Sequence, residues 1–291
     1  MGVGEDFSTF CGNLVVSNRD VIAVRYGAIT KRLNLDFWNS DSETAHSFYT
    51  GSYGRGTAIG GTSDVDMLFT LPSSVYTTYN SYTSNGQSAL LQAVRTSIRK
   101  TYSSTDVGGD GQVVVVTFSD GVRFEVLPAF ENTAGTYTFP DSNSGGSWRT
   151  TNPKPEFAAI KKIDDDTNGN LKRLCKMARA WRREWSLNMS GLLIDTLAYY
   201  FIRDWQYRDK AFLYYDWMSR DFFAYLKEQD EKKTYWLSPG ANQWVWLGDK
   251  FQYKATRCYN ISLEAIDYAS KGYTTSARGK WRDIYGTSYP S

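Results

Sequence analysis

Residues 51–57 read Gly-Ser-Tyr-Gly-Arg-Gly-Thr, and residues 63–71 continue as Ser-Asp-Val-Asp-Met-Leu-Phe-Thr-Leu. The second segment has the apolar and β-branched character of a strand. Because side chains alternate across a strand, Asp64 and Asp66 should share one face while Val65 turns to the other. The sequence therefore predicts two carboxylates on one face of a sheet whose opposite face is buried.

The glycines of residues 51–57 indicate a phosphate-binding turn. A backbone N–H approaches a phosphate closely only where no Cβ intervenes, and tight turns need the φ freedom of glycine. We expect Gly51 and Ser52 to offer an N–H and a hydroxyl to a terminal phosphate, and Gly54 and Gly56 to turn the chain back. A plain surface loop is the alternative interpretation of the same glycines.

A third acid lies in a predicted β-hairpin. Residues 113–118 form a β-branched run, 119–121 read Ser-Asp-Gly as a hairpin turn, and 122–128 return as the second strand. Glu125 should face away from its apolar neighbours, and an unpaired acid in such a hairpin is costly to bury. Either an ion pair, for example with Arg123, or a metal ion would compensate its charge.

We interpret Asp64, Asp66 and Glu125 as one set of metal ligands. Adjacent carboxylates repel one another, and a divalent cation relieves that repulsion. Mg²⁺ prefers a few carboxylates together with phosphate oxygens and water. A glycine-rich turn beside such acids predicts metal-assisted chemistry on a nucleoside triphosphate. For the Asp pair alone, a solvated strand edge is the alternative.

The composition argues against several other classes of protein. The 291 residues carry 33 basic and 31 acidic side chains, so a protein dedicated to duplex nucleic acid is not expected. Three scattered cysteines and the single histidine, His46, form no zinc-binding pattern in the sequence. The first residues lack a signal-peptide pattern, and no apolar segment approaches the roughly 20 residues that span a bilayer. We expect a cytoplasmic protein without a membrane partner.

Apolar periodicity predicts several helices. They are expected at residues 7–36, 87–102, 170–185, 192–205, 211–226, 259–269 and 276–285. Irregular connections are expected at residues 72–86, 105–111 and 131–152, and the last of these has the length and composition of a substrate lid.

The helix at 170–185 carries a basic face. Lys172, Lys176, Arg179 and Arg183 recur at helical spacing, with no acid on the same face of the helix. A solvated face is the simpler interpretation, but a polyanionic ligand would also fit.

Several segments together resemble the polymerase-β-type nucleotidyltransferase superfamily. Within it, the chain is similar to the bacterial cGAS/DncV-like nucleotidyltransferases, cyclic-oligonucleotide synthases related to the animal cyclic GMP–AMP synthase and to the oligoadenylate synthases. The segments that carry the resemblance are residues 51–52, the Asp64-x-Asp66 pair, and residues 124–130, 171–181 and 277–290. One difference is Glu125, because the third acid of these enzymes is more commonly Asp.

The resemblance implies an α+β fold. It consists of a polymerase-β-like nucleotidyltransferase core with a mixed β-sheet, a long N-terminal spine helix and a C-terminal helical lobe. We expect the core at residues 1–165 and the helical lobe at 166–291. The resemblance also places triphosphate-binding bases at Lys176 and Arg179 and a phosphate-binding serine at Ser190.

The resemblance further implies the reaction. Asp64, Asp66 and Glu125 would hold two Mg²⁺ or Mn²⁺ ions while nucleoside triphosphates are joined and pyrophosphate leaves. The product would be a cyclic di- or trinucleotide, a second messenger for bacterial anti-phage signalling of the CBASS type. A downstream effector would recognise this product rather than the protein, and no obligate nucleic-acid partner is expected. The alternatives are a linear oligonucleotide synthase, an RNA-end nucleotidyltransferase and a catalytically silent nucleotide-binding module.

Overall fold

The computed structural model describes residues 2–61 and 64–291, which form two compact units. The sheet unit comprises Ser17–Gly54 and Thr62–Pro153, and the helical unit comprises Met1–Val16, Arg55–Gly61 and Lys154–Ser291. The first 16 residues and residues 154–165 therefore group with the C-terminal helices, whereas the domain expected at residues 1–165 included them.

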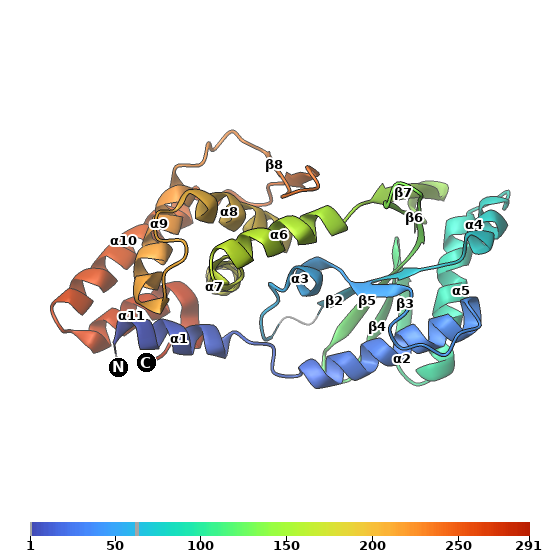
Figure 1. The fold of residues 1–291 in the computed structure, drawn as a ribbon, viewed down its shortest axis with the longest axis horizontal. Coiled ribbons are helices and arrows are strands. Elements are labelled where there is room, and N and C mark those ends of the chain that lie inside the picture. The colour runs from blue at the N-terminus through green and yellow to red at the C-terminus, as the bar shows by residue number, and fades with distance from the viewer. Residues whose placement is uncertain (1, 62–63) are drawn as a thin grey trace. The chain divides into compact units, whose positions relative to one another are not determined.

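The sheet unit is built on a mixed β-sheet (Figure 1). Its strands are β1 (Ser47–Tyr49), β2 (Asp64–Thr70), β3 (Asp106–Asp110), β4 (Val113–Thr117), β5 (Arg123–Glu131), β6 (Tyr137–Asp141) and β7 (Ser147–Thr151). The main path runs β1-β2-β5-β4-β3, and β6 and β7 continue from the end of β5. β2 and β5 are parallel, whereas β4 and β5 form the antiparallel hairpin that the sequence predicts.

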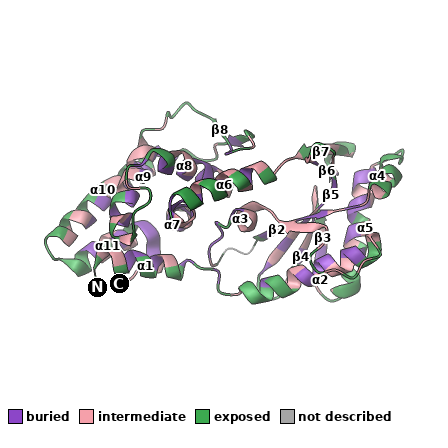
Figure 2. Ribbon diagram, in the orientation of Figure 1, coloured by how far each residue is buried: buried purple, intermediate pink, exposed green. Residues whose placement is uncertain are grey.

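One face of this sheet forms the core of the sheet unit. Val65, Met67, Phe124 and Val126 are completely buried, as the alternation along β2 and β5 predicts. Helix α5 (Gly86–Thr101) contacts β3 and β4, and α2 (Arg19–Phe37) packs on α5. The inner sides of these elements are buried in Figure 2. The opposite face carries the acids at the start of β2 and β5 and, further along the same strands, a smaller apolar cluster with Leu68 and Ala129.

Three segments expected to be irregular contain regular structure. Helix α4 (Ser73–Asn80) lies within residues 72–86, strand β3 occupies most of 105–111, and 131–152 contains the β6–β7 hairpin with a short 3₁₀ turn at Asn143–Gly145. The predictions were wrong for β3, β6 and β7 because pairing with neighbouring strands stabilises them rather than an apolar period of their own, and α4, which has no buried residue, contacts α5. β3 contains two glycines and two aspartates, yet it pairs with β4 over all five residues.

The predicted N-terminal spine helix is also wrong in detail, because it is two helices. α1 (Val3–Asn13) belongs to the helical unit and α2 to the sheet unit. At the break, the carbonyl of Leu14 accepts a hydrogen bond from the N–H of Gly60 (3.0 Å). Leu14 and Val16 are both buried, so the intervening chain serves packing instead of continuing the helix.

The helices of the helical unit pack around a large core that is rich in aromatic side chains. Its further elements are α6 (Lys154–Asp166), α7 (Asn170–Glu184), α8 (Gly191–Asp204), α9 (Tyr215–Lys227), α10 (Gln252–Ser270), α11 (Thr274–Tyr285), two 3₁₀ turns at Phe212–Tyr214 and Gly286–Ser288, and the hairpin of β8 (Tyr235–Leu237) and β9 (Trp244–Trp246). Phe7 of α1 makes an edge contact with Trp281 of α11 (5.1 Å between ring centroids). Trp181 and Tyr285 are buried in the same core. Most helices were therefore predicted here, but α6 was not, and α10 begins seven residues before the predicted start.

Candidate active site

The acids of β2 and β5 are brought together by parallel strand pairing. Asp66 lies opposite Glu125, and Asp64 lies opposite Arg123 in the same ladder. Asp64 is exposed and Asp66 is half-buried, while Val65 between them is completely buried. The predicted sharing of one face by Asp64 and Asp66 is therefore confirmed, and pairing adds Glu125 to that face.

Glu125 is held between like charges and one cation. The Arg123 guanidinium forms an ion pair with it, with 2.9 Å between Arg123 Nη2 and Glu125 Oε1. Burial raises the pKa of Glu125, and the charges of Asp66, Asp64 and Asp110 add to this effect while Arg123 opposes it. The ion pair that the sequence offered as an alternative to a metal is thus present in this structure, within a strongly acidic surrounding.

Gly51 lies directly against Asp66. A Cβ built on Gly51 would fall 1.8 Å from Asp66 Oδ2, and the φ of +53° is one that other residues rarely adopt. The N–H of Thr50 donates to the carbonyl of Asp66 (2.9 Å), which fixes the start of the segment against β2. A side chain at residue 51 would therefore displace the carboxylate of Asp66.

The predicted open turn is a short helix. α3 (Gly51–Arg55) places Ser52, half-buried, on its first turn and includes Gly54. The N–H of Gly54 donates to the carbonyl of Thr50 (2.8 Å), so Gly54 does not turn the chain back as predicted. Gly56, the other glycine expected to turn the chain, directly follows the last residue of α3 and has a positive φ of +72°.

The acid set fits a divalent cation by its chemistry but is not gathered into a binding site. Among residues 2–61 and 64–291, no three His, Cys, Asp or Glu side chains converge closely enough to hold a metal ion. The donors are carboxylates only, and burial, with a further contribution from the charges of Asp66 and Asp64, raises the pKa of Glu125. Hard cations with oxygen ligands suit this set.

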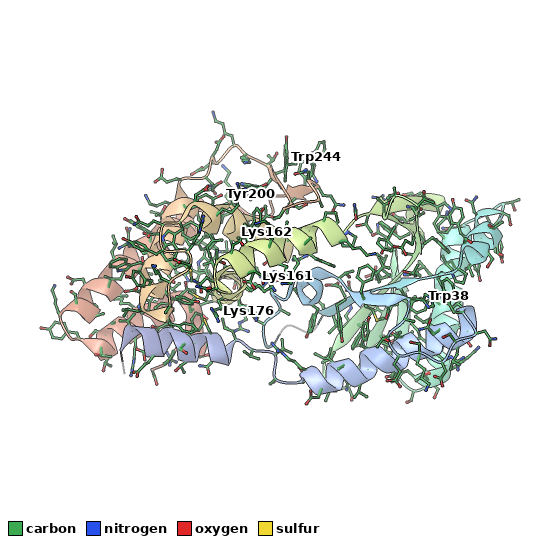
Figure 3. All side chains as sticks on the ribbon, in the orientation of Figure 1. Trp38, Lys161, Lys162, Lys176, Tyr200 and Trp244 are labelled. Atoms are coloured by element: carbon green, nitrogen blue, oxygen red, sulfur yellow. The ribbon has the colours of Figure 1, made fainter. Side chains whose placement is uncertain are left out.

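The three phosphate-binding candidates at Lys176, Arg179 and Ser190 belong to the helical unit. Lys176 lies half-buried on α7 (Figure 3). Ser190 precedes α8 and caps it, because its hydroxyl accepts a hydrogen bond from the N–H of Leu193 (3.1 Å). Arg179 is only 4% exposed, so it is not part of an open basic face.

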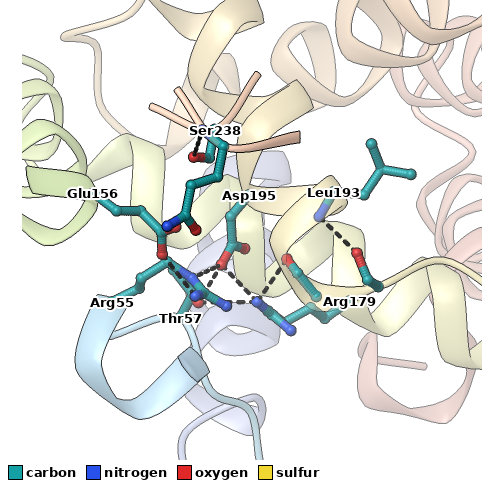
Figure 4. Close-up of polar contacts among 10 residues, drawn as sticks. Arg55, Thr57, Glu156, Arg179, Leu193, Asp195 and Ser238 are labelled. Atoms are coloured by element: carbon teal, nitrogen blue, oxygen red, sulfur yellow. Dashed lines mark hydrogen bonds and ion pairs between the residues drawn. The ribbon is translucent and has the colours of Figure 1, made fainter. Parts of the chain in front are cut away.

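Arg179 instead belongs to a buried charge network (Figure 4). Asp195 Oδ2 accepts hydrogen bonds from Arg179 Nη2 (2.7 Å), Arg55 Nε (2.6 Å) and Thr57 Oγ1 (2.8 Å). Glu156 receives a further bond from Arg55 Nη1 (2.9 Å). Burial alone would raise the pKa of Asp195, but the guanidinium groups of Arg179 and Arg55 outweigh it and lower that pKa. The network therefore ties residues 55–57 to α6, α7 and α8.

Comparison with known sequences assigns the chain to a family. Residues 1–164 match the Second Messenger Oligonucleotide or Dinucleotide Synthetase domain, abbreviated SMODS. The chain belongs to this family. The resemblance predicted from the sequence is thereby confirmed, and the acid-bearing strands β2 and β5 lie within the matched residues.

Curated relatives of this SMODS protein are cyclic nucleotide synthases by name. A probable cyclic nucleotide synthase of Bacillus cereus is 27% identical over 58% of this chain and 52% of its own length. A cyclic AMP-AMP-AMP synthase of Acinetobacter is 29% identical over 50% of this chain and 41% of its own length. The chain thus spans about half the length of the curated relatives that it matches.

Solved structures share the fold over almost the whole SMODS chain. Escherichia coli CdnC, in complex with HORMA-deltaN, matches with a TM-score of 0.69 at 14% identity, covering 99% of this chain and 98% of CdnC. Bradyrhizobium diazoefficiens CdnG, in complex with GTP, matches with a TM-score of 0.66 at 10% identity, covering 98% and 95%. The predicted α+β fold class is confirmed. None of the described helices is both long and apolar enough to cross a membrane.

The network around Asp195 was missed in the SMODS sequence, although a signal was present. Asp195 is the one acid in the apolar stretch 192–202, which lies in the helix predicted at residues 192–205. A buried acid requires a partner, and Arg55, in the glycine-rich stretch, is one of the two arginines that pair with Asp195. The basic face of α7 was likewise misjudged, because its acidic partners come from neighbouring helices: Lys172 Nζ lies 3.3 Å from Asp164 Oδ2 of α6.

Proposed function

We propose that this protein is a Mg²⁺-dependent nucleotidyltransferase that joins nucleoside triphosphates into a cyclic di- or trinucleotide and releases pyrophosphate. The cyclic product would act as a second messenger in bacterial anti-phage signalling, and an effector would recognise the product. The observation that carries the proposal is the pairing of Asp66 with Glu125, with the Asp66 carboxylate directly against Gly51, in a chain of the SMODS family.

Each candidate site residue in the sheet unit has a role in this proposal. Asp64, Asp66 and Glu125 would hold two Mg²⁺ or Mn²⁺ ions, and a carboxylate oxygen of this set would accept the proton of the attacking ribose hydroxyl. Bound metal would supply positive charge to the attacking and leaving oxygens. Gly51 and Ser52 would orient the terminal phosphates so that the hydroxyl attacks the α-phosphorus in line.

The helical unit contributes differently from the sequence prediction. Lys176 is retained as a proposed triphosphate-binding base. Arg179 is proposed to act through the network that holds residues 55–57 rather than by direct contact with phosphate, because its guanidinium is buried against Asp195. Ser190 is an exposed residue, and it is proposed as a phosphate contact through the hydroxyl that also caps α8.

The test is incubation of the purified protein with all four nucleoside triphosphates and Mg²⁺, alongside an Asp64→Asn/Asp66→Asn variant. Products are treated with phosphatase and resolved by mass spectrometry. Because the name of the Acinetobacter relative specifies a product of AMP units, ATP alone is included as a separate incubation.

The outcomes separate the candidate activities. A phosphatase-resistant cyclic product that the variant does not make supports the proposal and identifies the bases. Linear, phosphatase-sensitive products would replace it with a linear oligonucleotide synthase. Nucleotide binding without any release of pyrophosphate, with Mg²⁺ or Mn²⁺, would replace it with a silent binding module.

A further inference from the structure

Arg123 stands between two acids on the open face of the sheet. Its Nη2 lies 2.9 Å from Glu125 Oε1 and 3.6 Å from Asp110 Oδ2 of β3. All three residues belong to the sheet unit. The guanidinium therefore already touches two alternative partners, one of which is a proposed metal ligand and one of which is not.

We infer that Arg123 is the counter-ion of the metal-free acid set, and that it moves from Glu125 to Asp110 when divalent cations bind. The inference rests on the proposed function, because it takes Asp64, Asp66 and Glu125 as the metal ligands. It assigns roles to Arg123 and Asp110 that neither the family nor its reaction specifies: Arg123 competes with the metal, and Asp110 receives the displaced side chain.

The charge distribution explains why such a counter-ion is needed. Asp66 is paired opposite Glu125, and Asp64 opposite Arg123, so three carboxylates share this part of the sheet. Without a cation their repulsion would destabilise the folded chain, and one guanidinium at Glu125 reduces it. Once a divalent ion occupies the acids, the same guanidinium becomes a like charge and is repelled.

The local structure allows the exchange. Gly108 of β3 lies opposite Val115, which itself lies opposite Glu125, and a Cβ at Gly108 would meet no atom within 4 Å. The surface above Gly108 is therefore open, beyond the half-buried Val115 that lies between Glu125 and β3. Within the described part of the chain, the buried Nε of Arg123 has no hydrogen-bond partner, so only the end of the guanidinium holds it in place.

The test measures Mn²⁺ binding to the full chain without nucleotide, by the electron paramagnetic resonance signal of free Mn²⁺. Arg123→Gln should bind Mn²⁺ about tenfold more tightly than the wild type, because a nearby like charge is removed. Arg99→Gln is the matched control, since it removes the same charge from an exposed position on α5, and it should change the affinity by less than about twofold.

The destination of Arg123 is tested by a double-mutant cycle. Asp110→Asn should weaken Mn²⁺ binding by about threefold to tenfold, whereas Asp106→Asn, an exposed acid on the same strand, should have a smaller effect. In the Arg123→Gln background, Asp110→Asn should have no more effect than Asp106→Asn, because the side chain that Asp110 receives is gone. Circular dichroism confirms that each variant is folded.

The results distinguish the inference from the proposed function. If Arg123→Gln binds Mn²⁺ no more tightly than the wild type, while Asp66→Asn abolishes binding, the metal ligands stand and the role of Arg123 is wrong. If Asp110→Asn has the same effect with and without Arg123, the transfer to Asp110 is wrong. If neither the wild type nor Arg123→Gln binds more Mn²⁺ than Asp66→Asn, the metal assignment fails and the inference fails with it.

Discussion

Asp66 of β2 and Glu125 of β5 lie directly opposite each other in the parallel ladder, although 59 positions separate them in the sequence. Each strand turns its apolar side chains to the core, so the register that buries Val65 and Phe124 also places the two acids together. A shift of either strand by one residue would bury an acid and expose the core. Packing therefore enforces the acid pair.

Asp66→Asn should abolish synthesis without unfolding the protein. Loss of one proposed metal ligand is expected to reduce the rate by about a thousandfold or more. The melting temperature should stay the same or rise, because the charge of Asp66 repels Glu125. Pyrophosphate release and thermal unfolding measure the two effects. The control is Asp106→Asn, which removes an exposed acid of β3, and near-normal synthesis by Asp66→Asn would contradict the assignment.

Gly51→Ala should lose activity for a steric reason. The new Cβ would overlap Asp66 Oδ2, and the positive φ adds strain of about 1–2 kcal/mol. Gly135→Ala is the matched control, because Gly135 also has a positive φ (+75°) but has no atom within 4 Å of the new Cβ. Both variants should lose stability in urea unfolding, more so for Gly51→Ala because of its overlap with Asp66, and only Gly51→Ala should lose pyrophosphate release. Equal activity of the two variants would exclude this role of Gly51.

The sequence predicts the sheet-unit site well because strand patterns are local. Alternation along 64–70 and the Asp-Gly turn at 120–121 specify which side chains face together, and the structure has both. The parallel pairing of β2 with β5 is not local, but the shared demand for a buried face leaves little choice of register. The sequence also identifies Gly51 as a candidate site residue. It does not predict the short helix α3 that begins at this residue.

The helical unit shows what local sequence patterns do not predict, namely the long-range partners of a side chain. A helical period identifies a basic face on α7, but it does not say which helices cover that face. Arg179 is covered by Asp195, 16 residues away, and by Arg55 and Thr57, more than 120 residues away. The break between α1 and α2 has the same origin, because a hydrogen bond to Gly60 competes with the helix. Long-range partners decide these features.

Arg179→Met should act mainly on stability. Its removal would leave Asp195 buried with one fewer cation, and breaking a buried pair costs about 3–5 kcal/mol. Urea unfolding measures this loss. Arg183→Met is the control on the same helix, since Arg183 is exposed and should matter by about 1 kcal/mol or less. Unchanged stability together with a selective rise in KM for the triphosphate would show instead that Arg179 binds phosphate, as the resemblance implied.

Asp216→Asn should stabilise the protein in a pH-dependent way. Burial raises the pKa of Asp216 from 3.8 to about 6, so the folded chain holds this proton more tightly than the unfolded chain. The contribution of Asp216 to the free energy of unfolding therefore falls as the pH rises from about 4 through 6, by up to about 3 kcal/mol. Asn keeps an acceptor for the N–H of Trp217 and has no charge to bury. Thermal unfolding should show a higher melting temperature for Asp216→Asn at about pH 7.5 and little difference at about pH 4. Asp204→Asn removes an exposed charge from α8 and should show no such pH dependence, and an equal gain for Asp216→Asn at both pH values would refute the buried-charge explanation.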